Sequence, residues 1–537
     1  MCIFAPDKDS FTHNIYMIRH LLPIFLLFIP SLAIAQYFDE EDEDEIAKRA
    51  HLRINIEAQA SLSDGKTPLW LNANKHGLSS LEGTNGYLRA SAIHEMKPFD
   101  DEDEKPFDYA YGIDIAGAYG YTSTLVIQQA YGEVRWQRGK LTVGSKNWGM
   151  ELKDDQLSSG SQTLGINARP VPQVRLALDE FWPIPGTKGI INLKGHLAYG
   201  KMTDNNWQKD FTAKNTKYVE NGLYHSKAGY LKIGKEFSNL SLTLGAEMVT
   251  MFGGTSYNVA SADGSLHTYK NNSGLKAFWN ALVPTSSEGE VGETTYQNVA
   301  GNMLGSMIAR LDYSNDFWSA AAYIDHFFDD QSAMFLIDYD GYGTGDEWNI
   351  KKDNRIFMYK LKDMMLGFEW KRKLHSCIDA IVFEYIYSKY QSGPIYHDHT
   401  ISFPDHIGGK DNYYNNYMQS PYQHWGQVLG NPLYLSPLYN SDGVLEVKNN
   451  RFAAFHLGVG GHLSDDLSYR LLATFQDALG TYDKPYSKYK KSFNFMAEAT
   501  YQFPKHWQAR AAVGLDRGNV HGNNTGVQLT ISKSIYK

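Results

Sequence analysis

The chain has 537 residues, with 51 basic and 60 acidic side chains and a formal net charge of −9 at pH 7. This acidic balance argues against a nucleic-acid partner, because a phosphate backbone requires a basic surface. Two cysteines are too few for a disulfide scaffold. The aromatic fraction of 14% is high, and the composition leaves two serious classes: a large secreted β protein or a membrane β-barrel.

The N-terminus carries an export signal. Residues 21–35 read LLPIFLLFIPSLAIA, an apolar run of 15 residues that follows basic residues and ends in a small-x-small pattern. A spanning helix needs roughly 20 residues, so this run is too short to cross a membrane. We therefore predict a Sec-type signal peptide over 1–35, an acidic segment over 36–51 and one further domain over 52–537.

Downstream, apolar and polar residues alternate over segments of about ten residues, the pattern of transmembrane strands. The polar face carries bulky charged groups such as Lys194 and Glu498, as a wet lumen permits. The clearest segment is 507–516, in which two sets of residues alternate: Trp507, Ala509, Ala511, Val513 and Leu515 against Gln508, Arg510, Ala512, Gly514 and Asp516.

Connections between these segments alternate between short and long. Short ones lie at 137–140, 236–239, 314–317, 462–466 and 503–507, and long polar ones near 251–303, 328–353, 391–450 and 477–490. Outer-membrane barrels have short periplasmic turns and long outer loops, whereas a soluble sandwich has no reason to alternate them. The sequence therefore predicts an all-β fold, a transmembrane antiparallel β-barrel.

Seventeen strands are predicted by counting back from the C-terminus. One more within 52–75 places both ends in the periplasm and gives about 18. The seventeen are 524–535, 506–516, 491–503, 466–477, 451–462, 376–390, 354–371, 316–327, 304–313, 239–250, 223–235, 189–200, 166–178, 140–149, 123–136, 108–118 and 86–96. Aromatic residues at strand ends fit interfacial girdles, among them Trp318, Trp370, Phe503 and Trp507.

The long segment 391–450 is rich in rings among amides and carboxylates, including Tyr413, Tyr414, Tyr422 and Trp425. A sugar packs its apolar face on a ring while its hydroxyls take directional hydrogen bonds. We single these four residues out as candidate polysaccharide contacts. The alternative is that the rings pack the loop onto the barrel mouth.

No enzymatic or metal-binding pattern stands out, so we expect no enzyme, cofactor or metal site. A nucleophile elbow, HExxH, a P-loop and CxxC are all absent. His397 and His399 lie close together in the 391–450 segment but lack further ligands at a fixed spacing. Acidic blocks at 39–45 and 100–104 are interpreted as solvated segments, and Cys377 as a small apolar side chain on a strand.

The segment LSSGSQTLGINARPVPQ at 157–173 resembles the capsule assembly Wzi family of outer-membrane proteins, most specifically in its core NARPVPQ. Supporting segments lie at 68–77, 131–149, 194–205 and, more loosely, 225–234. The resemblance implies an eighteen-stranded barrel closed by its own long extracellular loops. It also implies a lectin-like anchor that holds capsular polysaccharide at the cell surface after export by a separate translocon. The chain departs from the family pattern in ending Tyr536-Lys537, without a terminal aromatic residue.

Within the motif, Asn167, Arg169 and Gln173 carry groups that can bind sugar hydroxyls or uronic carboxylates. Pro170 and Pro172 interrupt a strand ladder, so this piece should reach into or over the lumen before a strand at 173–178. The alternative for Arg169 is a lumen-facing residue paired with an acidic wall.

The sequence thus predicts a monomeric outer-membrane barrel that binds capsular or another surface polysaccharide without chemistry. Its other partners would be outer-membrane lipid, lipopolysaccharide and, during biogenesis, the barrel-insertion machinery. One alternative is a porin-like solute channel, which needs an open lumen. Another is an outer-membrane hydrolase, which needs a recognisable triad or dyad.

Overall fold

The computed structural model divides into two units, His51–Ile535 and a second formed by Met1–Ala50 with Tyr536–Lys537. The described residues are 51–97, 106–235, 237–261, 263–283, 301–329, 336–339, 341–357, 362–391, 395–396, 406–407 and 410–537. The predicted signal peptide, both acidic blocks and the pair His397 and His399 lie outside them.

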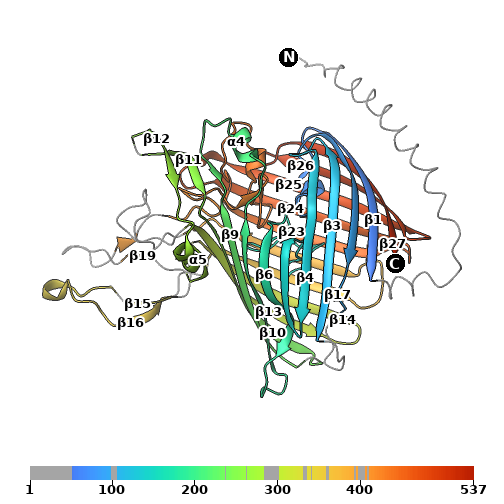
Figure 1. Ribbon diagram of the computed structural model, residues 1–537, viewed down its shortest axis with the longest axis horizontal. Helices are drawn as coiled ribbons and strands as arrows, with labels where there is room; N and C mark the ends of the chain where they lie inside the picture. Colours follow the sequence, from blue (N-terminus) through green and yellow to red (C-terminus); the bar gives the residue numbers. More distant parts are fainter. Residues whose placement is uncertain are drawn as a thin grey trace, which may run out of the picture. The chain divides into compact units, whose positions relative to one another are not determined.

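The unit His51–Ile535 is a closed antiparallel barrel of 18 strands (Figure 1). Each strand pairs with the next along the chain, and β1 closes the sheet by pairing with β27. The first nine strands are β1 (Leu52–Asp64), β2 (Thr84–His94), β3 (Phe107–Tyr119), β4 (Leu125–Trp136), β5 (Gly139–Ser145), β6 (Gln173–Pro183), β7 (Ile191–Lys201), β9 (Leu223–Ile233) and β10 (Leu240–Phe252). The other nine are β13 (Asn302–Ser314), β14 (Trp318–Asp329), β17 (Met364–Arg372), β18 (Ala380–Tyr387), β23 (Arg451–His462), β24 (Leu467–Gly480), β25 (Pro485–Phe503), β26 (Trp507–Gly518) and β27 (Asn524–Tyr536).

The predicted alternation is confirmed as an apolar outside and a polar inside. On β3, Ile113 is 60% exposed while its neighbour Asp114 is fully buried. On β26, Val513 is 51% exposed while Asp516 is 1% exposed. Because side chains in a strand point alternately to the two faces of the sheet, the barrel presents an apolar outer wall and encloses hydrogen-bonding groups.

All eighteen predicted strands are present, with corrections at some bounds. The strand predicted over 166–178 begins only at Gln173, because Pro170 and Pro172 cannot join the ladder and the chain before them lies inside the barrel. The strand predicted over 354–371 is two strands, of which only β17 belongs to the barrel. The long connection expected at 477–490 is only 481–484, since β24 and β25 extend as one hairpin. Cys377 is exposed in the turn before β18, so its predicted place on a strand is wrong.

Successive connections lie at opposite ends of the barrel. The end that carries 137–138, 234–239, 315–317, 463–466 and 504–506 is called the short-turn end here, and the opposite one the long-loop end. The long-loop connections hold small two-stranded or three-stranded sheets and short helices, together with the 3-10 turns Gly345–Glu347 and Pro437–Tyr439. These are β8 (Tyr218–Glu220), β11 (Thr255–Ala260), β12 (Leu266–Lys270), β15 (Leu336–Tyr339), β16 (Asn354–Phe357), β19 (Ile395–Tyr396), β20 (His406–Ile407), β21 (Gln423–His424), β22 (Gln427–Val428), α3 (Leu69–Asn72), α4 (Trp207–Phe211) and α5 (Leu275–Leu282). Across the described part of the chain, no helix has the length and apolar character needed to cross a membrane.

Candidate functional site

Three connections fold into the barrel and together form what we call the plug, made of residues 65–83, 146–172 and 410–450. Their side chains are largely buried, including Trp70, Ser159 and Tyr414. Polar groups on the inner faces of many strands meet plug atoms. Trp70 Nε1, for example, donates to Thr474 Oγ1 at 3.1 Å, and Gln476 Nε2 donates to the Leu433 carbonyl at 2.9 Å. The lumen is therefore closed by the chain itself, as the resemblance implied.

The plug is tied to the wall most densely at Glu384 on β18, which is fully buried. Its carboxylate accepts hydrogen bonds from Ser158 Oγ at 2.6 Å, from the Ser159 backbone nitrogen at 2.8 Å and from the Ser159 hydroxyl. Tyr323 Oη on β14 donates to the same carboxylate at 2.6 Å. A second charged contact joins Lys153 to Asp325 at 2.7 Å. Residues of the motif 157–173 thus lock the plug to the barrel.

Asn167 joins the three segments of the plug. Its Oδ1 accepts from the Asn74 backbone nitrogen at 3.1 Å, and its Nδ2 donates to the Val428 carbonyl at 2.9 Å. Close packing here also explains a glycine of the motif: a Cβ added at Gly165 would lie 2.8 Å from the carbonyl oxygen of Leu429. Asn167, singled out from the sequence as a sugar ligand, is only 2% exposed and is engaged within the protein. The structure favours a positioning role for it.

The three tyrosines singled out from the sequence are packed inside the plug. Tyr413, Tyr414 and Tyr422 are at most 1% exposed, so no ring face is open to a ligand. Their hydroxyls donate to Asp363, to the Gln162 carbonyl and to the Thr163 carbonyl respectively. The geometry fits the alternative stated above, in which these rings pack the loop, and we do not carry them forward as polysaccharide contacts.

Arg169 and Trp425 form a stacked pair next to the connection between β3 and β4 at the long-loop end. The guanidinium carbon lies 4.3 Å from the Trp425 ring centroid, and the terminal nitrogens donate to Thr122 and Ser123 hydroxyls at 3.0 and 3.3 Å. Burial lowers the pKa of Arg169 to about 10, so the group remains charged at neutral pH. The acidic wall considered for Arg169 is not among the contacts that the described residues make with it.

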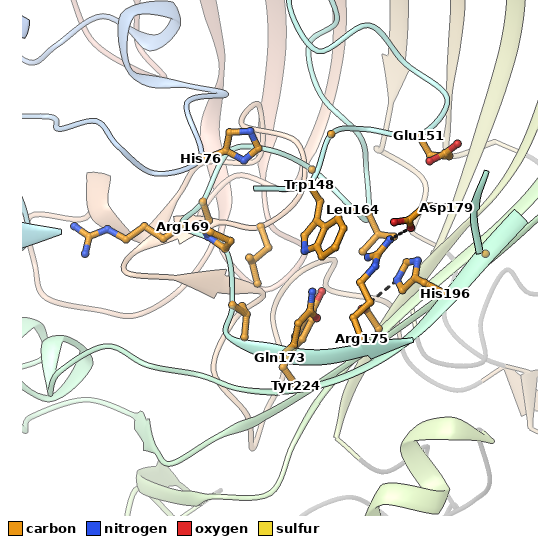
Figure 2. Close-up of a pocket in the computed structure, with 18 of the residues that line it drawn as sticks. His76, Trp148, Glu151, Leu164, Arg169, Gln173, Arg175, Asp179, His196 and Tyr224 are labelled. Atoms are coloured by element: carbon orange, nitrogen blue, oxygen red, sulfur yellow. Dashed lines mark hydrogen bonds and ion pairs between the residues drawn. The ribbon is translucent and has the colours of Figure 1, made fainter. Parts of the chain in front are cut away.

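A small cavity of about 90 Å³ lies between the plug and the inner faces of β6, β7 and β9. Trp148 stands in its middle and Gln173 and Arg175 on its wall, whereas the Arg169 side chain points away from it (Figure 2). The Arg175 guanidinium carbon stacks 4.0 Å from the Trp148 ring centroid. His196 Nε2 lies 3.2 Å from Ser226 Oγ on the same wall.

Apart from Nε of Arg169, whose side chain points away, three buried polar atoms of the cavity lining have no hydrogen-bond partner within the described part of the chain: Trp148 Nε1, Gln173 Oε1 and Arg175 Nε. A buried donor or acceptor without a partner costs about 1–3 kcal/mol, so a ligand that supplies partners to these atoms would be stabilised there. Two are donors and one is an acceptor. This is the set that a hydroxyl-bearing molecule satisfies, because each hydroxyl both donates and accepts.

Charges of both signs surround the cavity. Lys194 Nζ lies 2.6 Å from Glu151, and Asp179 lies 3.5 Å from Lys140 and 3.9 Å from Arg175. Burial raises the pKa of Glu151, and the attraction of Lys194 offsets only part of this effect. The site therefore combines an aromatic face, amide and guanidinium donors, and paired charges.

Of the cavity residues, the sequence singles out Gln173 but not Trp148, Arg175 or His196. Trp148 lies at the end of the predicted strand 140–149, and the alternating pattern gives Arg175 and His196 no distinction from other polar-face residues of β6 and β7. The signal that could have found Trp148 is its place in the supporting segment 131–149, which ends eight residues before the motif begins. Only the fold of 146–172 back into the lumen brings Trp148 against Arg175.

Comparison with known proteins finds no matching family model and no matching curated protein. Among solved structures, the chain is similar to the Escherichia coli outer-membrane protein Wzi, described as a carbohydrate-binding β-barrel involved in group 1 capsule assembly. The TM-score is 0.52 at 12% identity, over 91% of this chain and 86% of that one. Two Pseudomonas aeruginosa proteins also match over most of both chains. OprD has a TM-score of 0.41 at 9% identity over 91% of this chain and 95% of its own. OccK2 in complex with glucuronate has 0.43 at 8% identity over 91% and 98%.

The likeness to Wzi establishes the fold alone, since identity is low. Together with the apolar outer wall, it identifies the chain as a transmembrane antiparallel β-barrel of 18 strands, closed by its own loops.

Proposed function

We propose that this protein is an outer-membrane, lectin-like barrel that attaches capsular or another surface polysaccharide to the cell surface. The observation that carries the proposal is the cavity beside the plug, where Trp148 Nε1, Gln173 Oε1 and Arg175 Nε all lack partners among the described residues. An indole face stacked on a guanidinium, with free donors and an acceptor around it, matches the needs of a sugar unit.

Outer-membrane location is part of the proposal. The continuous apolar outer wall requires a lipid surrounding, because exposed apolar patches of this extent are unfavourable in water. A closed barrel satisfies its backbone groups within the sheet, which is the condition for spanning a bilayer with strands. The fold is also that of the E. coli protein Wzi.

Polysaccharide attachment needs no bond to be made or broken. A polymer offers the same unit many times, so several weak contacts along it give firm retention. We therefore propose a non-enzymatic, monomeric protein. The partly exposed Trp425, stacked on the buried Arg169, adds an aromatic group at the long-loop end, where a polymer chain outside the cell would meet the barrel.

The test is a deletion strain stained for cell-attached and shed polysaccharide. Loss of attachment, with total polysaccharide unchanged, is the expected result. The strain is complemented with the wild-type gene, with Arg175→Gln, and with Phe237→Ala as a control, since Phe237 is 92% exposed in a turn. We expect the wild type and Phe237→Ala to restore attachment and Arg175→Gln to restore it poorly.

The channel alternative is separated by conductance of the purified protein in a planar bilayer. A plugged lumen predicts little steady current. A large steady conductance, together with normal polysaccharide attachment in the deletion strain, would replace this proposal with a porin-like function.

A further inference from the structure

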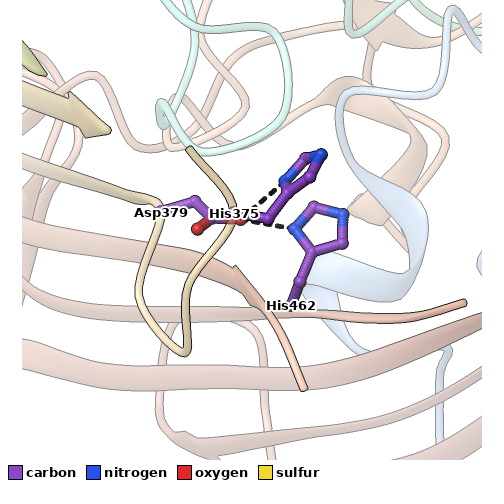
Figure 3. A group of neighbouring side chains, drawn as sticks. All are labelled: His375, Asp379 and His462. Atoms are coloured by element: carbon purple, nitrogen blue, oxygen red, sulfur yellow. Dashed lines mark hydrogen bonds and ion pairs between the residues drawn. The ribbon is translucent and has the colours of Figure 1, made fainter. Parts of the chain in front are cut away.

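Three side chains with metal-binding atoms meet at the short-turn end of the barrel: His375, Asp379 and His462 (Figure 3). His375 and Asp379 belong to the turn between β17 and β18, and His462 is the last residue of β23. Their potential ligand atoms all lie within 4.8 Å of one another. The cluster is invisible in the sequence, because His462 stands 83 residues after Asp379.

We propose that His375, Asp379 and His462 form a binding site for a divalent late first-row metal ion, with Zn²⁺ the ion to test. Two imidazoles and one carboxylate are a ligand set that such ions favour. This site is separate from the polysaccharide cavity and does not depend on the function proposed above.

The geometry converges on one point. The Nδ1 atoms of both histidines face the same carboxylate oxygen, Asp379 Oδ2, His375 Nδ1 at 3.4 Å and His462 Nδ1 at hydrogen-bonding distance. Ligand atoms around a tetrahedral zinc lie about 3.3 Å apart, given bonds of about 2.0 Å. The His375–Asp379 separation already fits, and a rotation of the partly exposed His462 ring would lengthen the other contact.

Backbone hydrogen bonds fix the turn against β23, and one backbone nitrogen of the turn also holds the carboxylate. The Asp379 nitrogen donates to the Gly460 carbonyl at 2.9 Å, and the Ser376 nitrogen donates to Asp379 Oδ1. The His462 nitrogen donates to the Ser376 carbonyl at 2.8 Å. Groups that orient a ligand in this way raise metal affinity because less order has to be gained on binding.

The site is open on its solvent side. The His375 side chain is 72% exposed, that of His462 29% and that of Asp379 17%. Three protein ligands with free space leave room for water as a fourth ligand. Arg372, the last residue of β17, donates to the Ser376 hydroxyl at 3.0 Å.

The two imidazole rings lie side by side at the cluster, with centroids 3.9 Å apart. One divalent ion between the rings can therefore reach a nitrogen of each and the Asp379 carboxylate together.

The experiment is calorimetric titration of Zn²⁺ into the untagged protein, purified in detergent and freed of metal with EDTA. We expect one equivalent to bind. Both His375→Ala and Asp379→Asn should weaken binding at least about tenfold, as loss of a ligand or its support does. His267→Ala, at an exposed histidine of β12, serves as the matched control and should bind as the wild type does.

Co²⁺ in place of Zn²⁺ gives a second readout, because a protein-bound ion of low coordination has visible absorption bands that hydrated Co²⁺ lacks. These bands should vanish in His375→Ala. Since His375 is mostly exposed, that variant should keep the heat-modifiable migration of a folded barrel. Absence of zinc binding by the wild-type protein, or equal binding by wild type and a folded His375→Ala/His462→Ala variant, would overturn the proposal.

Discussion

Asn167 and Arg169 are two residues apart in one motif, yet they make different contacts in the fold. Asn167 forms hydrogen bonds that join three loops, while Arg169 stacks on Trp425 near the long-loop end. The sequence could nominate both, because their side chains can bind sugars. It could not separate them, since the outcome depends on Val428 and Trp425, more than 250 residues later.

Trp148→Phe tests whether the indole N–H of Trp148 contributes to polysaccharide binding in the cavity. The substitution keeps an aromatic face against Arg175 and removes the indole N–H that lacks a partner among the described residues. One neutral hydrogen bond is worth about 1 kcal/mol net, so affinity for the polysaccharide should fall about fivefold. Binding is measured with the purified protein and oligosaccharides from the shed polymer. Trp279→Phe, on the exposed face of α5, is the control, and equal affinities in the two variants would remove Trp148 from the site.

Asn167→Ala tests the junction of the plug. It leaves the Asn74 nitrogen and the Val428 carbonyl without buried partners, each at a cost of about 1–3 kcal/mol. We expect limited proteolysis to cut 410–450 faster while the barrel strands stay protected. The exposed Asn349→Ala should digest like the wild type; an Asn167→Ala variant as resistant as Asn349→Ala would mean that the junction adds little.

At the scale of elements, strands were predictable and the plug was only partly so. Period-two alternation is a local property, and it located seventeen of the barrel strands, including β26 and β27, whereas β1 followed from placing both ends of the barrel on one side. Strand ends such as the start of β6 shifted where the chain turns inward. That turn depends on Glu384, Asp325 and other inner-wall groups far along the chain, which periodicity does not encode.

Glu384→Leu should loosen the plug. The substitution removes both oxygens that accept from Ser158, Ser159 and Tyr323, and leaves the Ser159 backbone N–H unpaired in a buried site. We expect single-channel conductance to appear in planar bilayers, where the wild type carries little current. Glu384→Gln should conduct less than Glu384→Leu. Its amide oxygen can still accept from Ser159, and its amide nitrogen can donate to the hydroxyls of Ser158 and Tyr323. Equally closed barrels in all three proteins would place the main anchor elsewhere.

On the scale of the whole molecule, the apolar outer wall suits the protein to lipid and not to water. Ile113, Leu125, Val143 and Val513 are between 51% and 62% exposed, a distribution that only lipid or detergent stabilises. The total number of strands followed from alternation together with the demand that both ends of the barrel lie on one side. The number of strands in the barrel can therefore be predicted from the sequence more readily than the conformation of the plug inside it.

Ile113→Arg tests the membrane-facing wall. An arginine at the middle of a lipid-facing strand costs about 2–4 kcal/mol in a bilayer. The midpoint of urea unfolding in lipid vesicles should fall accordingly. Phe237→Arg, at a turn residue that is already 92% exposed, should leave it unchanged. Identical midpoints for both variants would mean that Ile113 does not face lipid.

The contacts of plug segment 65–83 also bear on how the barrel assembles. The Leu69 nitrogen donates to the Asp516 carboxylate, and Trp70 Nε1 donates to the Thr474 hydroxyl. The hydrogen-bond partners of this segment thus lie 447 and 404 residues later in the chain. β1 must meanwhile find β27 to seal the cylinder. The segment 65–83 therefore reaches its native contacts only when the C-terminal strands are present, so its burial and the closure of the barrel are coupled steps of assembly.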